Sequence, residues 1–325
     1  MARKMQQPSA PPWKPDATTP RDRHRLEGLE PDNLLAVMAL IGLLRALETA
    51  RPAWRPRAFW DVETDPWRPV LTLAEAQTEA DLAQAAAEGV RELAGHHDAT
   101  GDQADLKLSP EYFANLREAT NTKGRGVLDA LCCPGATRKD DALWPTPFAF
   151  MFGQGHQHFL SRFRGVPAGN SSDPAASTFF ATSLFAPWKR EDRTDGFRWD
   201  PAEDRRYALR AVNPSNDKAT TQHGANALAA ICLPLLPLTP IRRRGETRVL
   251  TPMTRYGTGG QIEFTWPLWA RSASLVVILA LLRHPELAKD SPEAANLPQT
   301  AALLRARRIS VGKYFNVTPA TPPSP

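Results

Sequence analysis

The stretch LLAVMALIGLLRAL, residues 34–47, sets the centre of the predicted fold. Its apolar side chains occur on every side of an α-helix, so a helix over Leu26–Leu47 must be surrounded by other elements. Pro31 suits a first helical turn, and Pro52 disfavours helical backbone in the residue before it. Gly42 costs about 1 kcal/mol of helix propensity relative to alanine. We therefore expect another backbone to approach the helix closely at Gly42.

The chain from 26 to 140 is predicted to form a mainly helical region. Two short apolar runs on either side of a Pro-rich turn are typical of strands. An Ala-rich and Glu-rich periodic stretch after them indicates an amphipathic helix. The predicted strands are 58–60 and 70–73, and the predicted helices after the central one are 74–93, 111–119 and 126–131.

Residues 141–317 are predicted to mix strands with buried helices. Phe148, Phe150 and Phe152 alternate with the period of a strand. The other predicted elements are a helix at 226–231, an apolar buried helix at 272–282, a cationic helix at 300–307, and strands at 248–254, 261–266 and 309–315. Together the two regions predict an α+β fold.

Both ends of the chain are predicted to be disordered. The sequence has 325 residues, of which 31 are proline. Prolines are concentrated in 1–25 and 318–325, where little apolar surface is available to offset the entropy of ordering the chain. We expect folding to begin at Leu26 and to end near 317.

Charge is distributed unevenly along the sequence. The formal net charge is +5 and the sequence pI is about 9.3. Residues 61–105 are strongly acidic, so the remainder is more basic than the total suggests, and no acidic residue follows Glu293. This segregation predicts a basic face and favours polyanionic partners.

Several classes of protein are excluded by pattern. The two longest apolar runs, 34–44 and 273–282, are well short of the roughly 17–20 residues that cross a bilayer. The first 25 residues lack the apolar segment of a secretory signal, so a cytoplasmic location is expected. Three cysteines, including the adjacent Cys132 and Cys133, provide neither a disulfide framework nor a spaced metal pair, and we expect reduced thiols.

Two histidine groups are candidate metal ligands. His96-His97-Asp98 could ligate a divalent metal with further ligands, although an exposed helix C-terminus, where imidazole is favourable beside the dipole, is the stronger interpretation. His156 and His158 lie two apart, as on one side of a strand, and a turn with histidines bonded to the backbone is the alternative. The sequence indicates no third ligand for either group.

The glycine-rich segment Tyr256–Gly260 resembles a phosphate-binding loop in its glycines alone. Because no Lys-Ser or Lys-Thr pair and no helix follow, a Walker site is excluded and a hairpin loop is expected. The chain also lacks a nucleophile elbow, a zinc helix and a dinucleotide fingerprint. We therefore expect no enzymatic activity and no cofactor.

Arginine clusters are the strongest indication of a binding surface. Arginine forks match phosphate oxygens, and each neutralised phosphate releases counterions. A solvated loop is the alternative. The candidate nucleic-acid-binding residues are Arg242, Arg243, Arg244, Arg248 and Arg255, with Arg205, Arg206 and Lys218 as further contributors. The segment Phe197–Tyr207, which contains two of them, can equally be a structural corner with internal ion pairs.

Blocks of this sequence resemble proteins encoded with type I-G (formerly I-U) CRISPR systems. The segment LEPDNLLA, residues 29–36, and GLLRAL, residues 42–47, are similar to the opening of such proteins. The blocks FRWDP (197–201), DRRYA (204–208), GAN (224–226) and FTWPLW (264–269) are similar to a shorter family from the same loci. The resemblance covers about two thirds of the chain in scattered blocks.

The resemblance implies a non-catalytic subunit of an RNA-guided effector in antiviral defence, either a compact Cas8-like subunit or a Cas3-associated subunit. In such complexes base pairing with the guide reads the sequence, while protein subunits hold strands and contact one another. The implied partners are crRNA, target DNA and other Cas proteins. The alternatives are a metal-dependent nuclease, in which His96, His97 and Asp98, or else His156 and His158, converge with further carboxylates, and a purely protein-binding scaffold.

Overall fold

Helix α1 (Leu34–Ala50) lies at the centre of the fold. In this computed structural model, the described residues are 18–151, 158–168, 176–203, 220–288, 297, 299–311 and 314–323. The predicted helix start at Leu26 is wrong, because Asn33 is the N-cap and its Oδ1 accepts hydrogen bonds from the backbone N–H groups of Leu35 and Ala36. Leu26 and Leu29 are fully buried outside the helix, which explains their apolar character.

Three distant parts of the chain hold the N-terminus of α1. Each contributes one hydrogen bond at the start of the helix or just before it. The bonds are Leu35 N–H to the Trp199 carbonyl (3.1 Å), the Trp266 indole N–H to the Pro31 carbonyl (3.0 Å), and Ala320 N–H to the Asp32 carbonyl (2.8 Å). Because these partners come from three later segments, the position of α1 depends on long-range contacts.

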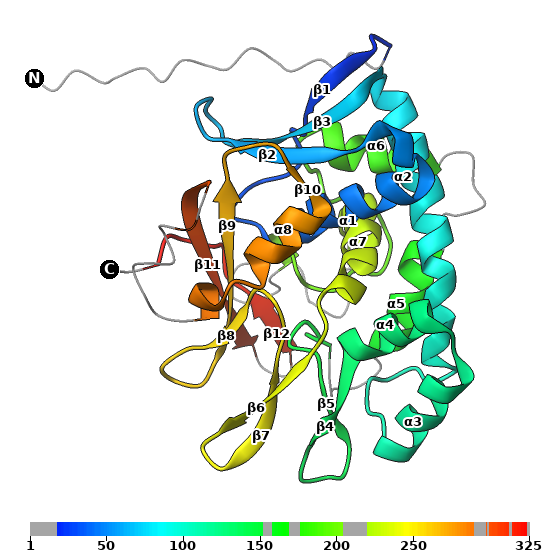
Figure 1. The fold of residues 1–325 in the computed structure, drawn as a ribbon, viewed down its shortest axis with the longest axis vertical. Helices are drawn as coiled ribbons and strands as arrows, with labels where there is room; N and C mark the ends of the chain where they lie inside the picture. The colour runs from blue at the N-terminus through cyan, green and yellow to red at the C-terminus, as the bar shows by residue number, and fades with distance from the viewer. Residues whose placement is uncertain are drawn as a thin grey trace, which may run out of the picture.

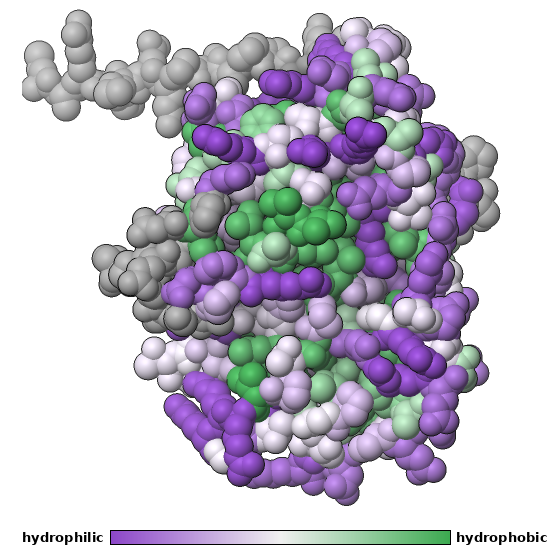
Figure 2. All heavy atoms as spheres, viewed as in Figure 1, coloured by the Kyte–Doolittle hydropathy of each residue, from purple (hydrophilic) through white to green (hydrophobic). Residues whose placement is uncertain are grey.

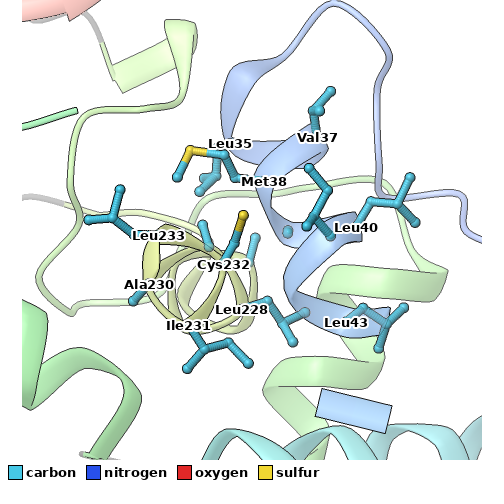
Figure 3. Packing of buried hydrophobic residues seen from close by; sticks show 14 of the residues in the cluster. Leu35, Val37, Met38, Leu40, Leu43, Leu228, Ala230, Ile231, Cys232 and Leu233 are labelled. Carbon is cyan, nitrogen blue, oxygen red and sulfur yellow. The ribbon is translucent and has the colours of Figure 1, made fainter. Parts of the chain in front are cut away.

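Helix α7 (His223–Cys232) packs directly against α1 (Figure 3). A Cβ atom built on Gly42 would lie 1.9 Å from the backbone oxygen of Leu228, so the two backbones touch. This confirms the predicted close approach at Gly42. On the neighbouring helix, a Cβ on Gly89 would lie 2.1 Å from the Ala46 oxygen of α1, so glycine also permits that contact.

The other helices include α2 (Glu79–Ala94), α3 (Pro110–Ala119), α4 (Thr122–Leu131), α5 (Phe159–Ala168) and α6 (Ala176–Phe185). Of these, α2, α5 and α6 pack against α1 or α7, whereas α3 and α4 lie farther toward one end of the molecule (Figure 1). The predicted start of the acidic helix at 74 is wrong, because Thr78 and Asp81 form a capping box and Ala74–Gln77 belongs to a strand. Sequence analysis did not predict α5 and α6.

The strands form two four-stranded sheets and two hairpins, and every described strand pair is antiparallel. The first sheet has the order β1 (Arg21–Arg25), β3 (Arg68–Gln77), β2 (Arg57–Asp61), β10 (Ala273–Ser274). The second has the order β12 (Tyr314–Val317), β11 (Thr300–Val311), β9 (Ile262–Trp269), β8 (Thr254–Tyr256). The hairpins are β4 (Cys132–Thr137) with β5 (Leu143–Pro145), and β6 (Thr239–Arg243) with β7 (Glu246–Leu250). The α+β prediction is confirmed.

Four further predictions are corrected by the strand arrangement. The expected cationic helix 300–307 is the strand β11, which pairs with β9. Within the predicted N-terminal tail, Arg21–Arg25 is β1, and within the predicted C-terminal tail Ala320 is buried. The expected strand through Phe148 and Phe150 is a turn with both rings buried, whereas Phe152 lies outside the described residues.

Helix α8 (Leu275–Leu282) is buried on one side only. Leu275, Ile278 and Leu282 face the core, whereas the side chains of Val276 and Val277 are 74% and 46% exposed. The prediction of a buried helix over 272–282 is therefore wrong in both its start and its burial. Figure 2 shows the result as a hydrophobic patch at the place where Figure 1 has α8.

The two regions predicted from sequence share one hydrophobic core. The cluster of buried side chains includes Leu34 and Leu82 from the first region and Leu228 and Phe264 from the second. Strand β10 of the second region also pairs with β2 of the first. None of the helices in the described residues is both long and apolar enough to span a membrane.

The Gly42 contact gives a stability prediction. The substitution Gly42→Ala places a methyl group against the Leu228 oxygen and should destabilise the protein by about 1–3 kcal/mol, despite a gain of about 1 kcal/mol in helix propensity. Gly126→Ala on α4 is the matched control, because nothing lies within 4 Å of that Cβ position, and it should stabilise slightly. Urea unfolding measures both. Equal stability of the two variants would contradict the assigned contact.

Candidate nucleic-acid interface

The β6–β7 hairpin carries the densest arginine cluster at its tip. Arg244 and Gly245 form the turn with φ angles of 49° and 80°, the left-handed backbone of a tight hairpin turn in which glycine is favoured. Arg242 and Arg244 are exposed, whereas Arg243 and Arg248 are half-buried. The hairpin therefore presents two guanidinium groups to solvent and holds two others against the protein.

A second hairpin, β4–β5, supports the first (Figure 1). The ring of Trp144 on β5 lies beneath the guanidinium carbons of Arg248 (4.2 Å) and Arg138 (5.5 Å). Lys139 Nζ reaches Glu246 Oε1 at 3.4 Å, and Gly135 faces Pro240. The two hairpins are therefore joined by stacking, an ion pair and backbone proximity, and they extend to the same end of the molecule.

We call this region the paired-hairpin surface. It consists of Lys107, Arg138, Lys139, Trp144, Arg242, Arg243, Arg244 and Arg248. Sequence analysis identified its four arginines on the β6–β7 hairpin and missed the other four residues. The missed signal is the charged turn RKDD at 138–141 between two short apolar runs, with a tryptophan just after it. Such a turn is typical of a hairpin tip.

Aromatic rings fix the orientation of the half-buried arginines. The guanidinium carbon of Arg243 lies 4.6 Å from the centre of the Tyr256 ring, and its Nη2 donates to the Gly257 carbonyl at 3.3 Å. Arg248 is held in the same way by Trp144. A guanidinium over an aromatic face keeps its charge and loses little solvation. The side chains are thus oriented before any ligand binds.

Two acidic residues neutralise only part of this charge. Glu246 pairs with Arg248 (2.5 Å) and Lys139, and the hydrogen bonds from these two cations lower the pKa of its carboxyl group. Asp140 pairs with Lys107 (3.3 Å) and Arg138 (3.2 Å). Arg242 and Arg244 have no ion pair among the residues that the structure describes. The free positive charge is therefore concentrated at the tip of the β6–β7 hairpin.

Arg255 does not belong to this surface. It is 6% exposed, and its Nε lies 3.4 Å from Glu263 Oε2 across the β8–β9 pair. Glu263 also contacts Arg305 (3.8 Å) and Arg307 (3.5 Å) on β11, so one buried carboxylate is shared by three strands. Removing one partner of such a buried group leaves a charge uncompensated. We assign Arg255 a structural role.

The other basic candidates belong to the segment that follows Glu203. Arg205, Arg206 and Lys218 lie outside the described residues. The described part of that segment, Phe197–Glu203, is a structural corner: Phe197 stacks on Trp199 at 4.3 Å between ring centres. Asp200 is buried there and accepts hydrogen bonds from Arg190 (2.6 Å) and Asn33 (3.0 Å).

The histidine candidates are not brought together. His97 is buried and stacks on Phe163 at 3.9 Å, and its Nδ1 lies 2.8 Å from the Phe163 carbonyl, so the expectation of an exposed helix C-terminus is wrong for this ring. His158 Nδ1 lies 3.2 Å from Asp105, and His156 lies outside the described residues. Over the described ranges, no group of three or more histidine, cysteine, aspartate or glutamate side chains could hold a metal ion.

The glycine-rich segment is the predicted hairpin loop. Gly257 N–H donates to the Gln261 carbonyl and Gly260 N–H donates to the Gly257 carbonyl, both at 2.9 Å. The loop connects β8 to β9 and receives Arg243 from the neighbouring hairpin. It therefore supports the arginine cluster.

Comparison with known proteins adds no assignment to this geometry: neither a protein-family model nor a curated protein matches the chain. The side chains described above are therefore the features of the chain that indicate a function. An exposed, partly preoriented set of arginines and lysines can bind phosphate groups or other anions.

Burial of His97 gives a pH prediction. Desolvation lowers its pKa to about 3, so between pH 6.5 and 3 the unfolded chain binds a proton that the folded chain excludes. Stability should fall as pH decreases through this window, by roughly 1.4 kcal/mol per pH unit from this group.

Urea unfolding of the wild type and His97→Asn at several pH values between 7.5 and 5 measures this contribution. The variant should show a flatter dependence, and the slope that remains is expected from His24, His96 and His223, whose pKa values burial also lowers. Parallel curves for the two proteins would contradict the assignment.

Proposed function

We propose that the protein is a non-catalytic subunit of a type I-G-like RNA-guided CRISPR effector, and that its paired-hairpin surface binds the phosphate backbone of crRNA or target DNA. The proposal includes other Cas proteins as partners and a cytoplasmic location. The observation that carries the nucleic-acid part is the pair of exposed arginines, Arg242 and Arg244, beside two arginines oriented by aromatic rings.

The charge arrangement supports backbone binding. The exposed side chains at the hairpin tip, Arg242 and Arg244, are cationic, and cations on an exposed tip suit contact with phosphates, which carry no base identity. Glu246 and Asp140 each pair with two cations and therefore repel an incoming polyanion less than free carboxylates would. A two-stranded antiparallel hairpin can also enter the major groove of duplex DNA.

The assignment to a CRISPR effector rests on the sequence blocks. FRWDP at 197–201 and FTWPLW at 264–269 are the most distinctive of them. In the fold these blocks provide Trp199 and Trp266, two of the residues that hold the start of α1. They are thus core-forming segments, and the proposed binding role belongs to the hairpins.

The metal-nuclease alternative has little support. His97 is occupied by its contacts with Phe163, and its low pKa reflects a dry environment. The scaffold alternative has a specific observation in its favour, the exposed apolar side of α8. Contact with a partner protein there is compatible with nucleic-acid binding at the hairpin tips.

The first prediction concerns DNA affinity. Arg242→Ala with Arg244→Ala should lower affinity for duplex DNA about tenfold at low salt, equivalent to about 1.4 kcal/mol. The slope of log K against log salt should fall by about 0.9 for each phosphate that is no longer neutralised, similarly for unrelated sequences. Fluorescence anisotropy from about 50 to about 200 mM salt measures both quantities.

The matched control is Arg91→Ala with Arg125→Ala, which removes two exposed arginines from α2 and α4. This control should leave both affinity and slope close to those of the wild type. Equal losses of affinity in the two double variants would indicate a nonspecific charge effect and would contradict a site at the hairpin tip. Sequencing of RNA that copurifies with the tagged chain from its native host tests the CRISPR role, which predicts repeat-containing guide RNA.

A second prediction concerns catalysis. With Mg²⁺ or Mn²⁺, the purified protein should leave single-stranded and duplex DNA and RNA intact, because the described residues provide no converging ligand set. Gel analysis of labelled substrates measures this. Cleavage that disappears in His96→Ala with Asp98→Ala would overturn the non-catalytic assignment.

A further inference from the structure

Helix α8 lacks the polar outer face of a surface helix. All eight residues of LVVILALL, 275–282, are apolar. Leu275, Ile278 and Leu282 are buried against the core. The side chains of Val276, Val277 and Ala280 are exposed and do not contribute to the core. A helix that is apolar on every side is ordinarily covered on every side. The outer side of α8 therefore has the composition of a contact surface.

The exposed side chains form a hydrophobic patch near the middle of the face drawn in Figure 2. Figure 2 shows hydrophobic residues over α8 with hydrophilic residues above and below them. Val276 and Val277, with Trp67 in the connection between β2 and β3, are the large hydrophobic side chains that are exposed in the described chain. Contiguous apolar patches with polar rims mark sites of protein contact.

Three arginines lie close to α8 in the sequence or in the sheet. Arg271 precedes β10 by two residues, Arg57 is the strand partner of Ser274 on β10, and Arg283 is the C-cap of α8. All three are exposed. The sequence has no acidic residue between Glu263 and Glu286, or between Glu48 and Asp61. An apolar helix is thus bordered by arginines from two segments.

We propose that the outer side of α8 docks an amphipathic helix of another protein, with an apolar stripe that covers Val276 and Val277 and acidic side chains that meet Arg57, Arg271 and Arg283. A second copy of this chain is a poor occupant, because twofold pairing through α8 would bring the two arginine borders together. The basic N-terminal segment, with Arg3, Lys4 and Lys14, is unsuitable for the same reason.

The inference deepens the proposed subunit role by naming the chemistry of a protein partner. It does not depend on nucleic-acid binding, since α8 and the paired-hairpin surface share no residue. Peptide binding measured without nucleic acid therefore tests the docking site separately. If DNA binds and the peptide does not, the docking site on α8 is rejected. If the peptide binds and DNA does not, the hairpin site is rejected.

The experiment uses the full chain and two synthetic helical peptides of about 18 residues with identical leucine stripes. One peptide has glutamate on both flanks of the stripe and the other has lysine. Fluorescence anisotropy of labelled peptide should show at least about tenfold tighter binding of the glutamate peptide. Val276→Ser with Val277→Ser should weaken that binding at least about tenfold, whereas Trp67→Ser, the matched exposed apolar control, should not.

If the valine variant is unstable, a variant with reversed charges beside α8 tests the proposal in its place. Arg57→Glu with Arg271→Glu leaves the apolar side of α8 intact and should shift the preference to the lysine peptide. Failure of both peptides to bind, equal binding of both, or an unchanged preference after reversal would overturn the proposal. Sedimentation analysis tests whether a second copy of this chain binds α8. A wild-type dimer that dissociates in the valine variant would overturn the proposal in favour of self-association.

Discussion

The backbone contact between α1 and α7 at Gly42 is the constraint on which the rest of the fold depends. With Gly42 against the Leu228 oxygen and Gly89 against the Ala46 oxygen, three helices approach at distances that no side chain would allow. Such packing buries every residue of α1 from 34 to 44, so the apolar surface of that part of the helix is satisfied. The sheets and hairpins then attach around this helical centre, and the basic hairpin tips project away from it (Figure 1).

Much of this centre is predictable from sequence, because local pattern and tertiary environment agree there. The apolar run at 34–47 and its single glycine indicate both a central helix and a close neighbour. The disagreement at 300–307 has a clear physical origin: alanine, leucine and arginine favour a helix, yet pairing with β9 places Leu304 opposite Trp266 and Arg307 opposite Glu263. Tertiary pairing outweighs propensity differences that are fractions of a kcal/mol per residue.

The sequence predicts that the candidate site is rich in arginine, but it does not predict which residues form the site. Arg242, Arg244 and Arg255 each add one positive charge to the sequence. Only the fold shows that Arg255 forms an ion pair with Glu263 on the adjacent strand. Trp144 lies about a hundred residues before Arg248, and nothing local in either segment indicates that they stack. The same limitation applies to α8, where sequence identifies an apolar helix but cannot tell which of its sides the core leaves uncovered.

The hydrogen bonds at the start of α1 have a consequence for biosynthesis. The partners of Leu35, Pro31 and Asp32 are Trp199, Trp266 and Ala320, so the start of α1 is completed by segments that leave the ribosome later. Contacts of such sequence separation slow folding and leave apolar surface exposed meanwhile. Newly made chains should therefore occupy general chaperones until the segment that contains Ala320 has left the ribosome, even though α1 itself emerges much earlier.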